Sequence, residues 1–270
     1  MAPDADAGLS ARDVAILVPR GGDLELTDSE RLSLRHLDEI LPGYDRYLVR
    51  PRSARSSLAG FEVKPFADRF FETYERYQAL CLSRQFYEAF RDYQYILIYQ
   101  LDALVFSDRL LEWCATGIDY IGAPWVGCPW PDRVGNGGFS LRRVEGFLSV
   151  LDSPSYWIEP KEYWRRHWSR RSTLVRVANW PRRELKRIRR FNSARQAPNL
   201  WRANEDVFWS YKAEQLWPPF RRASVEEGLR FAFETSPRKC FELTDGELPF
   251  GCHAWERYDP DFWRPFLLKR

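Results

Sequence analysis

Apolar runs alternate with helical patterns along the first hundred positions of the chain. Residues 13–19 contain the continuous run VAILV, which is typical of a strand buried on both faces. A helical pattern begins near Thr27, and a second short strand is expected at residues 47–49. A longer helix over residues 72–90 precedes a strand at residues 95–99. This β-α-β alternation predicts a mainly parallel α/β sheet flanked by helices, with right-handed crossovers.

The last of these strands delivers one carboxylate into an apolar segment. Residues 95–106 read YILIYQLDALVF, in which Asp102 is the one charged position. An ionised Asp in such surroundings is costly unless a partner neutralises it. Ligands of parallel sheets bind beyond the carboxyl ends of the strands, which is where Asp102 falls. A cation, a ribose or an Arg would satisfy this carboxylate, and an Asp that caps the next turn is the alternative.

Four further motifs follow later in the chain. The first ends a strand at an aromatic residue, the second is a Gly-rich segment that leads into a strand, the third contains a pair of acidic residues, and the fourth contains a His near the C-terminus. In chain order they are YIGAPW at residues 120–125, VGNGGFSLR at 134–142, NEDVFW at 204–209 and PFGCHAW at 249–255. Such a series recurs in glycosyltransferases that use nucleotide-diphospho-sugars.

The five motifs, in this order, resemble a bacterial family catalogued only as a domain of unknown function. That family is similar to GT-A glycosyltransferases and is associated with surface-polysaccharide synthesis. The resemblance extends from Tyr74 to Trp255. It implies a GT-A-like fold and a hexosyltransferase-like enzyme. Its partners would be a nucleotide-sugar donor and a glycan or lipid-linked glycan acceptor, whose hydroxyl group receives the sugar.

The resemblance assigns roles to the strand end and to the late His. Asp102 stands where the last Asp of an Asp-x-Asp metal motif belongs, and Gln100 replaces the first Asp. His253 is then the candidate that completes the ligand shell of Mn²⁺ or Mg²⁺, and a purely structural His is the alternative. Gln100 can hydrogen-bond a ribose or uracil, but it removes one negative charge from the metal site. Metal dependence therefore stays open.

The Gly-rich and aromatic motifs are candidates for contacts with the sugars. Gly137 and Gly138 would let the backbone approach a sugar closely, because no Cβ blocks it, although a tight turn before a strand explains them too. Asn136 is a candidate hydrogen-bond partner of the sugar. Trp125 is a candidate platform for the acceptor, because aromatic faces pack against pyranose rings, and a core role is the alternative.

The acidic pair Glu205 and Asp206 resembles the motif that supplies the base in several inverting transferases. A base that removes the proton of an acceptor hydroxyl during bond formation contributes about 10²- to 10⁴-fold to the rate. The alternative is charge that complements the start of a helix capped by Asn204. We expect an inverting mechanism with one of the two carboxylates as the base. Which of them acts is open, and so is a retaining route.

Length and composition fit one globular domain. The 270 residues are 44% hydrophobic and 29% charged, so we expect a single domain over residues 13–270 behind a flexible N-terminus of residues 1–12. The sequence has no apolar run of about 18 residues and no secretory pattern at its start. Its five cysteines show no paired spacing. These features predict a cytoplasmic location.

One segment departs sharply from this composition. Residues 161–195 hold thirteen Lys or Arg against two acids, whereas the whole chain has a net charge of +3. We therefore expect a basic insertion at about residues 161–198 that contacts an anionic membrane surface, peripherally and on its inner face. The candidate contacts are Arg182, Arg183, Arg187 and Arg190. The alternative is a polyanion- or nucleic-acid-binding protein without catalysis, although no known nucleic-acid motif accompanies the block.

Overall fold

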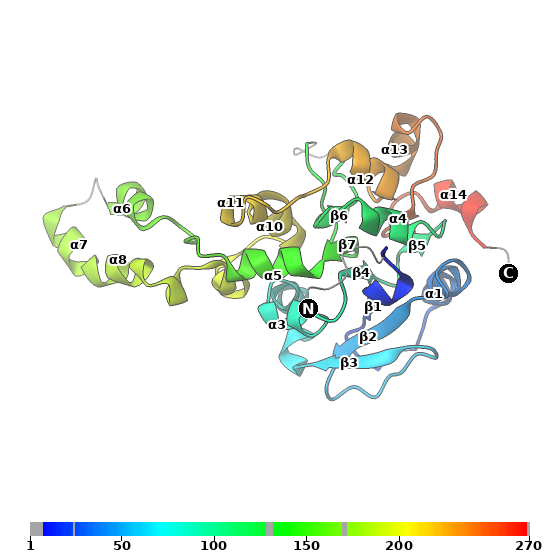
Figure 1. The fold of residues 1–270 in the computed structure, drawn as a ribbon, viewed down its shortest axis with the longest axis horizontal. Coiled ribbons are helices and arrows are strands. Elements are labelled where there is room, and N and C mark those ends of the chain that lie inside the picture. The colour runs from blue at the N-terminus through cyan, green and yellow to red at the C-terminus, as the bar shows by residue number, and fades with distance from the viewer. Residues whose placement is uncertain (1–7, 24, 128–131, 169–171, 269–270) are drawn as a thin grey trace.

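The computed structural model describes residues 8–23, 25–127, 132–168 and 172–268, without the side chains of residues 166–168 and 183. A six-stranded sheet with the order β3-β2-β1-β4-β7-β6 forms its centre (Figure 1). Strands β1 to β4 are mutually parallel, β7 is antiparallel to β4, and β6 is antiparallel to β7. The predicted fold class, a single α/β domain with a mainly parallel sheet, is confirmed. The strands are β1 Val14–Pro19, β2 Asp45–Pro51, β3 Glu62–Phe66, β4 Tyr95–Tyr99, β6 Tyr120–Gly122 and β7 Phe139–Arg143.

Helices cover both faces of this sheet, and a small second sheet with the order β5-β9-β8 lies beside it. Its strands are β5 Leu104–Val105, β8 Ala232–Phe233 and β9 Gly251–Cys252. The helices are α1 Asp28–Ile40, α2 Tyr74–Cys81, α3 Arg84–Glu88, α4 Leu110–Ala115, α5 Val144–Asp152, α6 Pro160–Trp168, α7 Thr173–Ala178, α8 Trp180–Arg187, α9 Ala197–Leu200, α10 Glu205–Tyr211, α11 Ala213–Leu216, α12 Val225–Phe231, α13 Pro237–Leu243 and α14 Pro260–Trp263. Short 3-10 turns occupy Ala11–Asp13, Asp68–Phe70, Arg189–Phe191, Ala194–Gln196 and Arg264–Phe266.

Strand β1 explains why the sheet is buried on both faces. Ile16 and Val18 pack into the apolar cluster under α1 and α4, while Ala15 and Leu17 pack into the cluster under α3, α5 and α10. Successive side chains of a strand point to opposite faces, so a continuous apolar run supplies both clusters. All four residues are fully buried.

Two expectations need correction. The helix predicted over residues 72–90 is two helices, α2 and α3, because the Ser83 hydroxyl donates to the Leu80 carbonyl (2.7 Å) and competes with the helical hydrogen bonds. Strand β3 was not expected, because it is an edge strand with exposed charged positions and a proline. The expected flexible N-terminus lies partly outside the described residues. No described helix is long and apolar enough to span a bilayer.

Candidate active site

The antiparallel strand β7 brings two sequence motifs together. Tyr99, the last residue of β4, is paired with Phe139, the first residue of β7. The Gln100 amide donates to the Gly138 carbonyl (2.9 Å) immediately beyond this pair. Since β4 is parallel to β1, this edge is also the carboxyl end of β1. The acidic strand end and the Gly-rich motif therefore meet at the edge where α/β sheets bind ligands.

His253 lies at the centre of a polar cluster at this edge. Its Nε2 is 3.1 Å from Asp102 Oδ1 and 3.1 Å from Gln100 Oε1. Its Nδ1 is 3.0 Å from Glu234 Oε1. Strand β9 positions the ring, because His253 follows this strand directly. The backbone amide of His253 donates to the carbonyl of Phe233 (3.0 Å), the residue before Glu234. The sequence predicted Gln100, Asp102 and His253 for this site but missed Glu234, which follows a strand of only two residues.

The two carboxylates of the cluster control the charge of His253. Burial lowers the pKa of His253, but hydrogen bonds and charges from Asp102 and Glu234 outweigh it and raise the pKa to about 9. A protonated imidazole donates from both nitrogens and cannot bind a metal ion. Within the described residues, no group of three or more His, Cys, Asp or Glu side chains is arranged to hold a metal ion. As arranged, these side chains do not fit Mn²⁺ or Mg²⁺, and the metal site stays a prediction.

The two adjacent glycines make room for protein side chains. A Cβ at Gly138 would lie 2.0 Å from His253 Nε2, and a Cβ at Gly137 would lie 2.1 Å from Glu205 Oε1. Such contacts are far inside van der Waals distance, so neither position accepts alanine without rearrangement. His253 and Glu205 fill the space that the missing side chains leave. The approach of a sugar to the backbone of these glycines stays a prediction.

Asn136 connects the two halves of the site. Its backbone is left-handed (φ 67°), a conformation that Asn tolerates better than most residues. Its Oδ1 accepts from the amides of Gly138 (2.9 Å) and Phe139 (3.3 Å), which fixes the loop before β7. The backbone amide of Asn136 donates to Asp206 Oδ2 (3.0 Å). Its role toward a sugar stays a prediction, while its structural role is to hold Asp206 against this loop.

Asp206 is a partly buried carboxylate with an unusual proton affinity. Oδ1 accepts from the Val207 amide (2.7 Å) and Oδ2 from the Asn136 amide. Burial, followed by the nearby charge of Glu205, raises the pKa of Asp206 to about 7, although both backbone hydrogen bonds act in the opposite direction. A carboxyl group that titrates near neutral pH is suited to take up and release a proton.

Glu205 has a different environment from its neighbour. It is almost fully buried and forms a two-pronged ion pair with Arg142 (Nη2–Oε1 2.7 Å, Nη1–Oε2 3.2 Å). Arg142 is itself fully buried and also donates to the hydroxyls of Tyr87 (2.9 Å) and Ser140 (3.0 Å). Glu205 therefore neutralises a buried cation. The sequence could have indicated this, because an arginine within the apolar face of a strand needs a buried acid.

Trp125 packs against the Gly-rich loop at Gly135. Its ring stacks on Tyr211 (centroids 6.2 Å apart, planes at 8°), and Arg133 lies over the Tyr211 ring at 4.8 Å. A Cβ at Gly135 would fall 1.9 Å from the Trp125 ring, so this glycine admits the indole. The predicted contact of Trp125 with an acceptor stays a prediction, and its observed contacts are structural.

Tyr74, which the sequence did not single out, lines two clefts beside the site. A cleft of about 240 Å³ lies at the ends of β1 and β4 and is lined by Pro19, Tyr74 and Gln100, among others. A groove of about 510 Å³ lies between α2 and α9 and is lined by Tyr74, Trp201 and Asn204, among others. Burial and the charges of Asp206 and Glu205 raise the pKa of Tyr74 to about 12.

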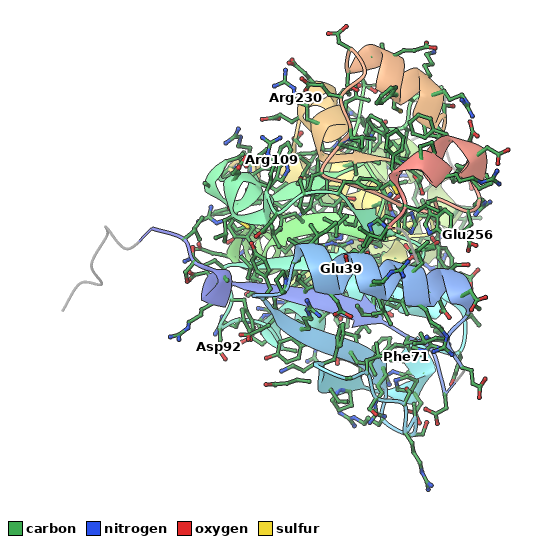
Figure 2. The ribbon with its side chains drawn as sticks, turned by 90° about the vertical axis from the view of Figure 1, so that its right-hand side faces the viewer. Glu39, Phe71, Asp92, Arg109, Arg230 and Glu256 are labelled. Carbon is green, nitrogen blue, oxygen red and sulfur yellow. The ribbon has the colours of Figure 1, made fainter. Side chains whose placement is uncertain are left out.

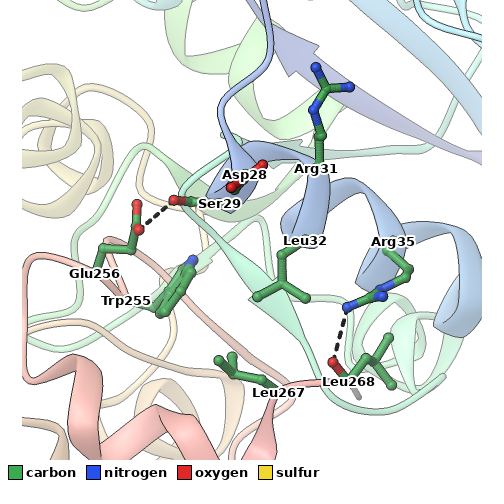
Figure 3. Close-up of a pocket in the computed structure, with 9 residues that line it drawn as sticks. All are labelled: Asp28, Ser29, Arg31, Leu32, Arg35, Trp255, Glu256, Leu267 and Leu268. Atoms are coloured by element: carbon green, nitrogen blue, oxygen red, sulfur yellow. Dashed lines mark hydrogen bonds between the residues drawn. The ribbon is translucent and has the colours of Figure 1, made fainter. Parts of the chain in front are cut away.

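A larger cavity of about 660 Å³ lies between α1 and the C-terminal segment (Figure 3). The Ser29 hydroxyl donates to the Glu256 carboxylate across it, and Arg35 donates to the Leu268 carbonyl (3.0 Å). Buried His36 of α1 also accepts from the Leu268 amide (3.1 Å) through Nε2. These contacts fasten the C-terminal segment to α1.

Residues 60–253 match the family described as "Protein of unknown function (DUF5672)", and the chain belongs to this family. No curated protein matches the chain. Among solved structures, the chain is similar to a glycosyltransferase involved in the glycosylation of the major capsid of PBCV-1, with 13% identity, a TM-score of 0.39 and coverage of 89% of this chain and 91% of that chain. It is also similar to the galactosyltransferase LgtC in complex with donor and acceptor sugar analogs, with 13% identity, a TM-score of 0.41 and coverage of 94% and 100%. These TM-scores are below 0.5, so the likeness alone assigns no function.

Proposed function

We propose that this protein is a GT-A-like glycosyltransferase that moves a sugar from a nucleotide-sugar donor to a hydroxyl group of a glycan or lipid-linked acceptor. The observation that carries the proposal is Asp206, whose pKa of about 7 suits a general base near neutral pH. It lies at the ligand-binding edge of the sheet, held by the Gly-rich loop. The motif resemblance supports surface-polysaccharide synthesis as the setting.

The two clefts beside Tyr74 suggest where the substrates bind. The cleft at the ends of β1 and β4 would take the donor nucleotide, with Gln100 near its ribose or base. The groove between α2 and α9 would take the acceptor, with the faces of Tyr74 and Trp201 against its sugar rings. Asn204 lines this groove next to the acidic pair, so an acceptor there is close to Asp206.

The reaction follows from this placement as a single displacement. The acceptor oxygen bonds to the anomeric carbon of the donor while its proton passes to an Asp206 oxygen. The bond from that carbon to the nucleoside diphosphate breaks, and the nucleotide leaves with the electron pair. Attack on the face opposite the leaving group inverts the anomeric configuration. Glu205 takes no part as a base, because Arg142 holds both its oxygens.

Nucleotide binding provides the direct test of this proposal. We expect one nucleoside diphosphate in a panel to raise the melting temperature, since ligand at about 100 times Kd adds about 2.7 kcal/mol of stability. The nucleotide-sugars that share its base should then be screened for release of nucleotide in the presence of glycan acceptors. No stabilisation by any nucleotide would contradict a transferase.

The pH dependence of transfer should follow the titration of Asp206. We expect kcat/KM to rise by about tenfold per pH unit below the pKa and to level off above pH 7, because only the ionised carboxylate accepts the proton. Stability should move the other way. The folded state binds this proton more tightly than the unfolded chain, so the contribution of Asp206 falls as pH rises from about 4 to 7. A flat rate profile across this range would contradict the assignment.

Replacing Asp102 with Asn should weaken nucleotide-sugar binding through His253. The substitution removes one of the two carboxylates that orient and charge the imidazole. From this arrangement we expect equal losses of affinity with and without Mn²⁺, measured by calorimetry. A loss that is larger with Mn²⁺ would show that Asp102 is a metal ligand, as the motif resemblance predicts. His253→Ala should reproduce whichever pattern is found.

A further inference from the structure

The basic insertion forms an arm that leaves the domain at a closed neck. Helices α6, α7 and α8 project away from the sheet on one side of the molecule (Figure 1). At the neck, the Trp157 amide donates to the Asn192 carbonyl (3.1 Å). The Asn192 side chain accepts from the Ile158 amide (3.1 Å) and donates to its carbonyl (2.8 Å). Asn192 is fully buried, so the two ends of the arm are joined firmly.

Cation–π contacts join the helices of this arm. Arg176 of α7 lies over the Trp164 ring of α6 at 5.8 Å, and Lys186 of α8 lies over the Tyr163 ring of α6 at 5.4 Å. The two aromatic rings of α6 are half-buried at these contacts, whereas Arg176 itself is exposed.

The large apolar residues of α7 and α8 are exposed. Leu174 is 83% exposed, Val177 67% and Trp180 57%. The exposed large hydrophobic residues of the described chain number eleven, and seven of them belong to the arm. Those seven are Leu174, Val175, Val177, Trp180, Leu185, Ile188 and Phe191. Concentrated apolar exposure of this kind marks a surface that is covered by a partner or a membrane.

Exposed arginines border the apolar residues. Along α8, Trp180 and Leu185 alternate with Arg182 and Arg187, all of them exposed. Arg189 and Arg190 continue the basic surface beyond the helix, while the side chain of Arg183, also predicted to take part, lies outside the described residues. A helix with apolar and basic faces is the kind that lies in the interface of an anionic membrane.

We propose that α7, α8 and the turn Arg189–Phe191 of the arm insert their exposed apolar side chains into the headgroup boundary of an anionic bilayer, with the arginines on the lipid phosphates. This proposal is independent of the transferase activity. A nucleic acid would engage the arginines but leave Leu174 and Val177 in water. A second copy of the chain would cover these residues but bring two strongly basic segments together. An anionic bilayer satisfies both kinds of side chain.

Vesicle flotation tests the arm with two sets of variants. The triple variant L174S/V177S/L185S should bind phosphatidylglycerol-containing vesicles at least tenfold more weakly than the wild type. The double variant R182Q/R187Q should lose about 25-fold, since each basic residue at the surface contributes about fivefold, and its loss should shrink at high salt. Neither should bind vesicles of pure phosphatidylcholine better than the wild type.

Matched controls lie on the body of the protein. R109Q/R230Q removes the same charge from the residue before α4 and from α12, on the surface shown in Figure 2. L243S removes an exposed leucine (55% exposed) from α13. Both controls should bind vesicles like the wild type, and transfer to a soluble acceptor should be normal in all variants.

Three results would overturn the proposal. The first is wild-type vesicle binding by both arm variants. The second is salt-sensitive binding of single-stranded RNA, lost in R182Q/R187Q, together with no vesicle binding by the wild type, which would assign the arm to nucleic acid. The third is a wild-type dimer in light scattering that L174S/V177S/L185S converts to monomer, which would make the arm a subunit interface. Circular dichroism of each variant confirms that the helices persist.

Discussion

Replacing Asp206 with Asn is expected to lower sugar transfer by about 10²- to 10⁴-fold and to leave the fold intact. The amide has the size of the carboxyl group but cannot accept the acceptor proton. One backbone hydrogen bond is lost, while the repulsion by Glu205 disappears, so stability should change by no more than about 1 kcal/mol. Initial rates at saturating donor, with urea unfolding in parallel, measure both quantities.

Asp119→Asn is the matched control for this variant. Asp119 is also a buried Asp whose pKa is raised by burial, and it accepts from the Arg221 amide (2.7 Å). It precedes β6, which is antiparallel to β7, so it lies at the edge of the sheet opposite the site. Its replacement should leave the rate unchanged. Near-normal transfer by Asp206→Asn would remove the base from this position and require another mechanism.

Replacing Glu205 with Gln is expected to destabilise the protein by about 3 kcal/mol. The substitution leaves the guanidinium of Arg142 buried without its counter-charge, while the remaining hydrogen bonds to Tyr87 and Ser140 persist. Nucleotide affinity should be retained at a temperature where the variant is folded. Urea unfolding monitored by tryptophan fluorescence gives the loss.

An exposed ion pair supplies the comparison for Glu205. Glu226→Gln breaks the pair with Arg230 on α12 (3.0 Å) and should cost less than about 1 kcal/mol, because both partners are solvated. The double variant Arg142→Met/Glu205→Leu should recover stability relative to Glu205→Gln, because apolar replacement of a whole buried pair is often neutral. If Glu205→Gln is as stable as the wild type, the pair does not anchor α10 to β7.

Much of the fold is predictable from the sequence because the parallel strands are buried on both faces. Strands β1 and β4 consist of continuous apolar residues, which few other elements require. The direction of β7 cannot be predicted in this way, since its residues would suit either orientation. That direction is what brings Gly138 to Gln100, so the geometry of the site depends on a feature that local patterns do not encode.

The strand end, the Gly-rich loop and the late His lie at one edge of the sheet, and their roles toward a substrate stay predictions. The sequence singles out these residues but does not distinguish the two neighbouring acids. It treats Glu205 and Asp206 alike, whereas their environments differ because Arg142, 63 positions earlier in the chain, pairs with one of them. Glu234 and Tyr74 were missed for the same reason, since their places depend on long-range packing.

The neck at Asn192 has a consequence for how the sequence of this family can change in evolution. Because hydrogen bonds join Trp157 and Ile158 to Asn192, the segment between them is closed on itself at the domain surface. Its length enters the folding free energy only weakly, since loop closure entropy grows with the logarithm of length. Relatives can therefore lengthen, shorten or recompose the arm without repacking the core. Membrane preference and sugar chemistry would then be free to diverge as separate traits within one family.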